Sequence, residues 1–320
     1  MMASYWWRLA WLALACFFAV HLAAGAAVAL LSRRAVRMVE RFTPRSAARA
    51  LFLLRLFPLT ISILAVSAVC IPSYLWLEPT SAQEQVGWMC AAAASLAILL
   101  WLDSAGRFLY TTTRSHRFTR RWRREGRPDR LGHAAAKAWV IQSDVPFLAL
   151  AGILRPRLIA SRGLLRTLSS GQLTAALHHE QAHRTSRDNL KRLIMHCAPG
   201  ALPFVSPSRR IEQAWAKFAE RAADDRAVSG DPSRALLLAE ALVRVARVAG
   251  PQAAPVAPLL ADRSELHARV NRLLQPASNP PAANRRLHMF ASAALAVLAV
   301  VALEPPVLRL AHRLLETLIR

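Results

Sequence analysis

Two histidines and a glutamate form the segment His-Glu-Gln-Ala-His that begins at His179. The spacing of four residues places His179 and His183 on one face of a helix, where both imidazoles can bind one Zn²⁺. Glu180 lies beside them, is not needed as a ligand, and can act as the general base that takes a proton from the attacking water. Ser169 and Gln172 form a capping-box pattern that predicts where this helix begins. The segment indicates a zinc hydrolase rather than a solvated helix face that carries the pattern by chance.

A catalytic zinc site needs a third protein ligand. The carboxylates that follow the motif are Glu212, Glu220, Glu240 and Glu265. Glu220 is favoured because Asp224 follows it one helical turn later, among alanines that allow close helix packing. We expect Glu220 to bind zinc and Asp224 to accept a hydrogen bond from the distal N–H of a ligand histidine. The alternative is a pair of solvated carboxylates beside Arg221 or Arg226.

One known class of zinc proteases extends the motif with a glycine turn and a third histidine. In this chain Ser186 and Asn189 occupy those two positions, which excludes that class. The ligand set expected here is therefore two histidines and one carboxylate, which suits Zn²⁺.

The composition is that of a basic membrane protein. The chain has 320 residues, 54% of them hydrophobic, with a mean hydropathy of +0.25 and a net charge of +23. Nearly all of the positive charge is arginine, because lysine occurs only at positions 137, 191 and 217. The cysteines, Cys16, Cys70, Cys90 and Cys197, show no Cys-x-x-Cys spacing, so neither a disulfide framework nor a cysteine zinc cluster is expected.

Four apolar segments predict transmembrane helices at residues 9–31, 56–77, 86–102 and 287–304. The first is too long for a usual signal-peptide core and has no obvious cleavage site, so we interpret it as a retained span. In the second, Arg55 is expected to extend to the membrane interface at one end, and Tyr74 and Trp76 to anchor the other.

The charges of the connecting segments orient the chain. The connection from residue 33 to 49 holds six arginines and one glutamate, whereas residues 78–85 hold two glutamates and no basic residue. By the positive-inside rule, the N-terminus lies outside and the segment with the metal motif faces the cytoplasm. The expected location is the inner (cytoplasmic) membrane, which the chain crosses several times.

A basic juxtamembrane segment, residues 104–135, follows the third predicted span. Its arginines, with Phe118 and Trp122 among them, could contact nucleic acid. Attraction to anionic lipid headgroups explains the same residues more simply, so membrane lipids are expected as partners and direct nucleic-acid binding is not.

Residues 136–275 are predicted to form an α+β zinc metallopeptidase domain. Strands are expected at residues 138–141, 147–154 and 157–160, and helices at 209–228, 231–248 and 263–274. An exposed edge strand beside the zinc site could bind an extended substrate by backbone pairing. A linker, residues 276–286, leads to the fourth predicted span, and residues 305–320 form an amphipathic tail expected to lie on the outer membrane surface, to contact a partner or to pack in a soluble core.

The chain resembles the membrane metallopeptidases of the BlaR/MecR type. The resemblance rests on the motif at His179, the Arg-Asp-Asn-Leu segment from Arg187, the Glu-x-x-Ala-Asp segment from Glu220, the segment at residues 152–157 and the Leu-x-x-Arg-Val-x-Arg-Leu-Leu segment from Leu266. It implies a fold with four transmembrane helices and a cytoplasmic gluzincin domain between the third and fourth. It also implies a zinc endopeptidase with Glu180 as the base.

In antibiotic-sensing members of that group, an extracellular penicillin-binding domain follows the fourth span, and activation removes a cytoplasmic transcriptional repressor. The resemblance thus implies a protein substrate similar to the BlaI/MecI repressors. After Glu304 this chain holds no Ser-x-x-Lys motif, so direct β-lactam sensing is not expected, and a separate sensor protein or a second copy of the chain stays open as a partner.

Two other functions stay open. In the first, the zinc domain transmits a conformational signal without cleaving anything. In the second, the protein is a housekeeping membrane protease similar to the HtpX-like group, which shares the His-Glu-x-x-His and Glu-x-x-Ala-Asp elements. Three spans before the metal motif favour the regulatory group.

Overall fold

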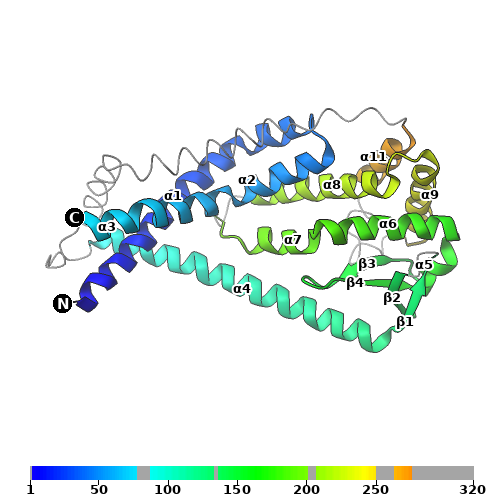
Figure 1. The fold of residues 1–320 in the computed structure, drawn as a ribbon, viewed down its shortest axis with the longest axis horizontal. Coiled ribbons are helices and arrows are strands. Elements are labelled where there is room, and N and C mark those ends of the chain that lie inside the picture. Colours follow the sequence, from blue (N-terminus) through cyan, green and yellow to red (C-terminus); the bar gives the residue numbers. More distant parts are fainter. Residues whose placement is uncertain (1, 78–86, 133–135, 201–206, 250–262, 276–320) are drawn as a thin grey trace.

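A computed structural model describes residues 2–77, 87–132, 136–200, 207–249 and 263–275. Three long helices run beside a group of shorter helices, and a small sheet lies at the end far from the N-terminus (Figure 1). The predicted fourth span, the linker before it and the C-terminal tail lie outside the described residues.

The first two predicted spans lie within long helices, and the third, predicted from residue 86, lies in a helix from residue 88 on. Helix α1 is Met2–Val39, and α2 (Pro44–Ala65) continues through the π-helical turn η1 (Val66–Cys70) into α3 (Ile71–Leu77). Helix α4 is Trp88–Glu125. These three helical stretches of the described chain are long and apolar enough to cross a membrane. All are longer than the roughly 20 residues that a bilayer requires.

Two side chains expected at the ends of the second span are buried against neighbouring parts of the chain. Arg55 is only 6% exposed; its Nε lies 2.9 Å from Glu212 Oε1 and its Nη2 donates to the carbonyl of Ala198 at 3.0 Å. Tyr74 is buried, and its hydroxyl donates to the carbonyl of Tyr5 at 3.3 Å. Arg55 therefore does not extend outward as expected, because neighbouring helices cover this face of α2. Trp76, the other expected anchor, is 69% exposed.

The sheet has the strand order β1-β2-β4-β3. Its strands are β1 (Arg127–Leu131), β2 (Ala136–Ile141), β3 (Leu148–Ala151) and β4 (Arg157–Ser161). Strands β1 and β2 are antiparallel, β2 and β4 are parallel, and β3 and β4 are antiparallel. The three predicted strands are confirmed, and β3 lies at an edge of the sheet.

Strand β1 was not expected, because it lies in the basic segment and carries no apolar alternation. Four of its five residues are exposed and only Leu131 is buried. Pro128 fits there because an edge strand pairs on one side only. The part of the basic segment before β1 continues α4 as far as Glu125.

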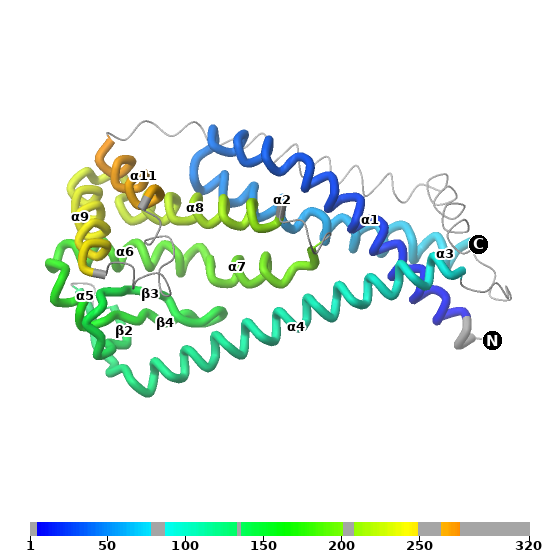
Figure 2. The backbone as a smooth tube through the Cα atoms, turned by 180° about the vertical axis from the view of Figure 1, so that it is seen from behind, coloured from blue at the N-terminus to red at the C-terminus, as the bar shows by residue number. Residues whose placement is uncertain are grey.

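The remaining helices follow the sheet in sequence. They are α5 (Arg162–Thr167), α6 (Ser170–Ser186), α7 (Asp188–Cys197), α8 (Pro207–Val228), α9 (Pro232–Ala249) and α11 (Arg263–Leu274). The helices predicted at 209–228, 231–248 and 263–274 are confirmed. Seen from behind, α9 and α11 lie at the end of α8 that is far from the N-terminus (Figure 2).

Helix α6, which carries the metal motif, begins and ends at sites that the local sequence determines. Ser169 accepts a hydrogen bond from the backbone N–H of Gln172, whose side chain accepts one from the backbone N–H of Ser169, so the predicted capping box is present. At the other end Arg187 takes a left-handed conformation, with φ 54° and ψ 41°. This residue separates α6 from α7 and turns the start of α7 back toward the metal motif.

Helix α8 joins the metal site to the long helices. Ile211, Trp215 and Phe218 of α8 are buried in one cluster with Leu51 of α2 and Met195 of α7. Leu51 and Ile211 are fully buried, and burial of each such side chain contributes about 1.5–3 kcal/mol relative to exposure. The helix that bears Glu220 therefore has a fixed position against α2.

Candidate metal centre

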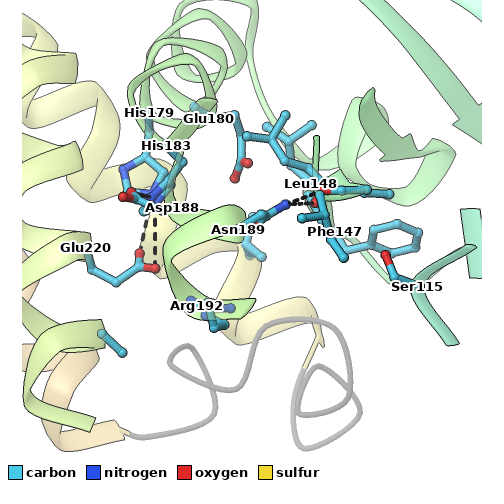
Figure 3. A pocket seen from close by; sticks show the side chains of 18 of the residues that line it. Ser115, Phe147, Leu148, His179, Glu180, His183, Asp188, Asn189, Arg192 and Glu220 are labelled. Atoms are coloured by element: carbon cyan, nitrogen blue, oxygen red, sulfur yellow. Dashed lines mark hydrogen bonds and ion pairs between the residues drawn. The ribbon is translucent and has the colours of Figure 1, made fainter. Parts of the chain in front are cut away.

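The side chains of His179, His183 and Glu220 converge from two helices. The Nε2 atoms of His179 and His183 lie 3.1 Å apart. The two carboxylate oxygens of Glu220 lie 3.4 Å from His179 Nε2 and 3.5 Å from His183 Nε2. Figure 3 shows Glu220 extending from the facing helix toward the two imidazoles. These three side chains form a group that could hold a metal ion.

The spacing of these atoms fits a zinc ion. Ligand atoms about 2.0–2.1 Å from a tetrahedral Zn²⁺ lie about 3.3 Å from one another. The two Nε2 atoms lie 3.1 Å apart, and each lies 3.4 or 3.5 Å from a different oxygen of Glu220. Two imidazoles and one carboxylate group also match the ligand types of catalytic zinc sites.

A carboxylate lies against the distal ring nitrogen of each histidine. His183 Nδ1 is hydrogen-bonded to Asp188 Oδ2 at 2.8 Å. His179 Nδ1 lies 2.9 Å from Asp224 Oδ1, as a close polar contact rather than an aligned hydrogen bond. A carboxylate at Nδ1 keeps the proton there, so that Nε2 is free to bind a metal. Asp224 is where the sequence predicted it, whereas the role of Asp188 was not predicted.

Arg269 of α11 holds the carboxylates of α8 in place. Its guanidinium makes a bidentate pair with Asp224, with Nε–Oδ2 and Nη2–Oδ1 distances of 2.9 and 2.7 Å. Its Nη1 lies 3.1 Å from Glu220 Oε2. Arg269 and Asp224 are 3% and 1% exposed, so this pair is shielded from water. Arg269 lies in one of the segments that resemble the BlaR/MecR type, but no role was predicted for it from the sequence.

The pKa values show that this cluster favours positive charge at the histidines. Burial lowers the pKa of His183, but its hydrogen bond with Asp188 and the nearby Glu220 outweigh burial and raise the pKa to about 10. For Glu220, burial raises the pKa, but the two histidines and Arg269 outweigh it and hold the pKa well below its usual range. An ionised Glu220 beside two imidazoles is the state that a cation requires.

Glu180 lies on α6 beside the ligands and is directed into the pocket, between His183 and the strand segment (Figure 3). Burial raises the pKa of its carboxyl above the ordinary value, although His179 and His183 act in the opposite direction. A raised pKa suits a carboxylate that must accept a proton and then release it.

The three other candidate ligands have different partners. Glu212 pairs with Arg55, and Glu240 accepts a hydrogen bond from the side chain of Gln172 at 2.8 Å. Glu265 is buried between Lys217 and Arg221, at 3.2 Å from each. Among the described carboxylates that follow the motif, the metal group therefore contains Glu220, as predicted.

A pocket of about 800 Å³ surrounds the motif. Residues 145–153, which include β3, form one wall, and α7 and α8 contribute Asn189, Arg192 and Glu220. Thr111 and Ser115 of α4 also line the pocket, so one of the long helices forms part of it. The volume suits a short peptide segment rather than a single small ion.

Other polar residues near the motif divide into two groups. His196 lines the pocket and is a candidate donor to the oxyanion of a reaction intermediate, together with the pocket arginines, whereas His267 is exposed on α11. His178 is exposed and Cys197 is buried, and neither belongs to the metal group found among the described residues.

No protein-family model, curated protein or solved structure matches the chain. The class of protein is therefore defined by what the described residues contain. They include three helices able to cross a membrane, a small mixed sheet, and a His-His-Glu group that could hold a metal ion.

Proposed function

We propose that this protein is an integral membrane zinc endopeptidase that hydrolyses peptide bonds of a cytoplasmic or juxtamembrane protein. One observation carries the proposal. The two Nε2 atoms and the Glu220 carboxylate converge at 3.1–3.5 Å in a peptide-sized pocket, with Glu180 beside them and an edge strand opposite. The resemblance to the BlaR/MecR type supports the same activity.

In this proposal His179, His183 and Glu220 hold the zinc ion. When bound, zinc supplies a Lewis acid that polarises the scissile carbonyl and makes water a better nucleophile. Glu180 takes the proton from the attacking water and delivers it to the leaving amine. Asp188 keeps the ring of His183 oriented, and Arg269 with Asp224 does the same for Glu220 and His179.

The substrate chain is proposed to lie along β3. This strand pairs with β4 on one side only, so its other edge offers backbone groups to an extended peptide. Residues 148–150 line the pocket together with Glu180 and His183, which supports a peptide bound between the strand and the metal helix.

The bonds between the long helices and the site support a regulated protease. Arg55 of α2 pairs with Glu212 on the helix that carries Glu220. Ser104 of α4 donates to the carbonyl of Cys197, and Arg107 donates to that of His196 at 3.0 Å. The carbonyls at the end of α7 are thus bonded to α4, while the start of α7 bears Asp188. A signal received by the spans would reach the site along α7 and α8, and we propose that the resulting cleavage inactivates a transcriptional repressor.

The same bonds also favour a second candidate, a transmembrane signal transmitter that does not cleave protein. It would use the movement of α7 and α8 without the chemistry of Glu180. A quality-control protease of the HtpX-like type has no such observation in its favour, because it needs no connection from the spans to the site.

The test compares membranes that contain the wild type with membranes that contain Glu180→Gln. Cytoplasmic and membrane proteins, including any repressor encoded nearby, are followed by mass spectrometry for new termini. The matched control is Glu125→Gln, which removes a carboxylate from an exposed part of α4 where it pairs with Arg121. We expect one or a few proteins to be cleaved in membranes that contain the wild type or the control. None of these proteins should be cleaved in membranes that contain the Glu180 variant.

Two results would contradict the proposal in different ways. Equal cleavage patterns in the wild type and the Glu180 variant, with zinc bound to both, would favour the transmitter. Cleavage of many unrelated membrane proteins would favour quality control.

A further inference from the structure

Asn189 is the second residue of α7, and neither metal binding nor proton transfer uses it. Its side-chain Nδ2 donates to the carbonyl of Leu150 at 3.0 Å and to that of Gly152 at 2.8 Å. Both acceptors are carbonyl oxygens, so only the amide nitrogen of Asn189 can serve them. Figure 3 shows the side chain directed toward the strand segment. Asn189 therefore joins the metal side of the pocket to β3.

The carbonyl of Leu150 belongs to the free edge of the strand, and that of Gly152 follows directly after the strand. The backbone N–H of Ser161 in β4 donates to the carbonyl of Phe147, so Phe147 faces β4. Backbone groups of an antiparallel strand alternate between its two sides. Residues 149 and 151 then face β4 as well, while Leu148 and Leu150 face the pocket. The contact of Asn189 with Leu150 agrees with this alternation, and the carbonyl of Gly152, the residue after β3, accepts from the same amide.

We infer that Asn189 is a specificity-determining residue that ends the substrate-binding edge of β3. Its amide takes the place that the backbone N–H groups of a longer peptide would occupy at Leu150 and Gly152. Of the carbonyls on the free edge from residue 148 to 152, the carbonyl of Leu148 is left to accept a hydrogen bond from a substrate. The inference rests on the proposed function and adds the register in which the substrate binds.

The position of Asn189 at the end of the substrate-binding edge is fixed relative to the metal ligands. Asp188, the preceding residue, is hydrogen-bonded to His183 at 2.8 Å. The left-handed turn at Arg187 directs both residues back into the pocket. Two adjacent residues, Asp188 and Asn189, therefore determine the distance from the metal group to the carbonyl of Leu148. A bound peptide then has one register in which one of its backbone N–H groups donates to this carbonyl and its scissile bond lies at the metal.

The inference predicts that one backbone N–H of the substrate matters for binding to the strand. In an antiparallel or a parallel arrangement, the single free carbonyl of Leu148 accepts from one substrate residue. If Asn189 is shortened, the carbonyl of Leu150 becomes free, and it lies on the same edge two residues further along. A second substrate N–H, two residues from the first, then gains an acceptor.

The experiment uses the full chain in detergent with zinc bound, and a fluorogenic peptide chosen from a library for cleavage by the wild type. A series of peptides replaces each backbone N–H in turn, except that of the scissile bond, with an ester oxygen. Hydrolysis at the scissile bond is measured for the wild type, Asn189→Ala and Asn189→Asp. The Asp variant keeps the size of the side chain but cannot donate, and zinc content with circular dichroism shows that each variant is folded.

For the wild type we expect one replacement to raise KM about 3- to 10-fold, the range for loss of one hydrogen bond, while kcat changes little. In Asn189→Ala, and in Asn189→Asp if the first variant does not fold, a second sensitive position appears two residues from the first. Two sensitive positions in the wild type, or an unchanged single position in a folded variant, would overturn the inference. Hydrolysis with no sensitive position would also overturn the inference, but it would still support the proposed protease activity. If the zinc-loaded wild type hydrolyses no peptide, both the inference and the proposed function are refuted.

Discussion

Loss of the Asp188 carboxylate should weaken zinc binding, although Asp188 is not a ligand. Asp188 is buried and holds His183 Nδ1 at 2.8 Å, so Asp188→Ala leaves this ring nitrogen without its acceptor. A hydrogen bond to a charged group contributes about 1.5–3 kcal/mol, which corresponds to roughly a 10- to 150-fold change in an equilibrium constant. Mutation of such partners usually costs about 10- to 100-fold in metal affinity. We expect the zinc Kd of Asp188→Ala to rise by a factor in this range.

The assay is a competition titration of the full chain in detergent against a chromophoric zinc chelator at constant pH. Asp188→Asn keeps an oxygen that can accept from His183 Nδ1, so its Kd should lie between those of the wild type and Asp188→Ala. Asp144→Ala is the control, because the Asp144 side chain is 90% exposed and pairs with Arg166. If Asp188→Ala is folded and binds zinc as tightly as the wild type, then Asp188 does not determine the orientation of His183, and the reasoning is wrong.

Three further predictions concern separate features of the fold. Glu220→Gln should remove a charged ligand and lower the zinc content of the protein purified in limiting zinc, as measured by atomic absorption, and an unchanged content would argue against Glu220 as a ligand. In a double-mutant cycle of Arg55→Met and Glu212→Gln, the second change should cost about 1–3 kcal/mol less after the first, by thermal or chemical unfolding, because the pair is largely buried; additive effects would mean that the pair is not coupled. Ser169→Ala should cost about 1 kcal/mol and raise hydrogen exchange in the first turn of α6 about fivefold, whereas unchanged exchange would show that the cap contributes little.

The motif and its helix could be predicted from the sequence because their determinants are local. The spacing of His179 and His183 follows from helical periodicity, and the cap at Ser169 needs only the next three residues. Glu220 could be chosen among four carboxylates because Asp224 and small residues mark one face of its helix. Each of these features lies within one element of secondary structure.

Contacts between distant elements could not be predicted. Arg269 meets Asp224 only because α11 folds back onto α8, and Asp188 meets His183 only because Arg187 adopts a left-handed conformation that is unusual for arginine. The sequence of α2 alone predicts that Arg55 lies at the membrane interface. Its pairing with Glu212 depends on the packing of α8 along α2. Strand β1 was missed because edge strands need no apolar alternation.

The length of α4 sets the distance between the pocket and the membrane in the proposed topology. Thr111 of α4 lines the pocket, and at 1.5 Å per residue it lies about 35 Å along the helix from Trp88. With Trp88 at one boundary of a hydrocarbon core about 30 Å thick, the pocket would begin about 5 Å beyond the other boundary. A peptide anchored in the same membrane would reach this height with about two extended residues. If the protein is the proposed protease, a soluble substrate would have to come to the membrane surface, so proximity to the bilayer would select substrates before any side chain is recognised.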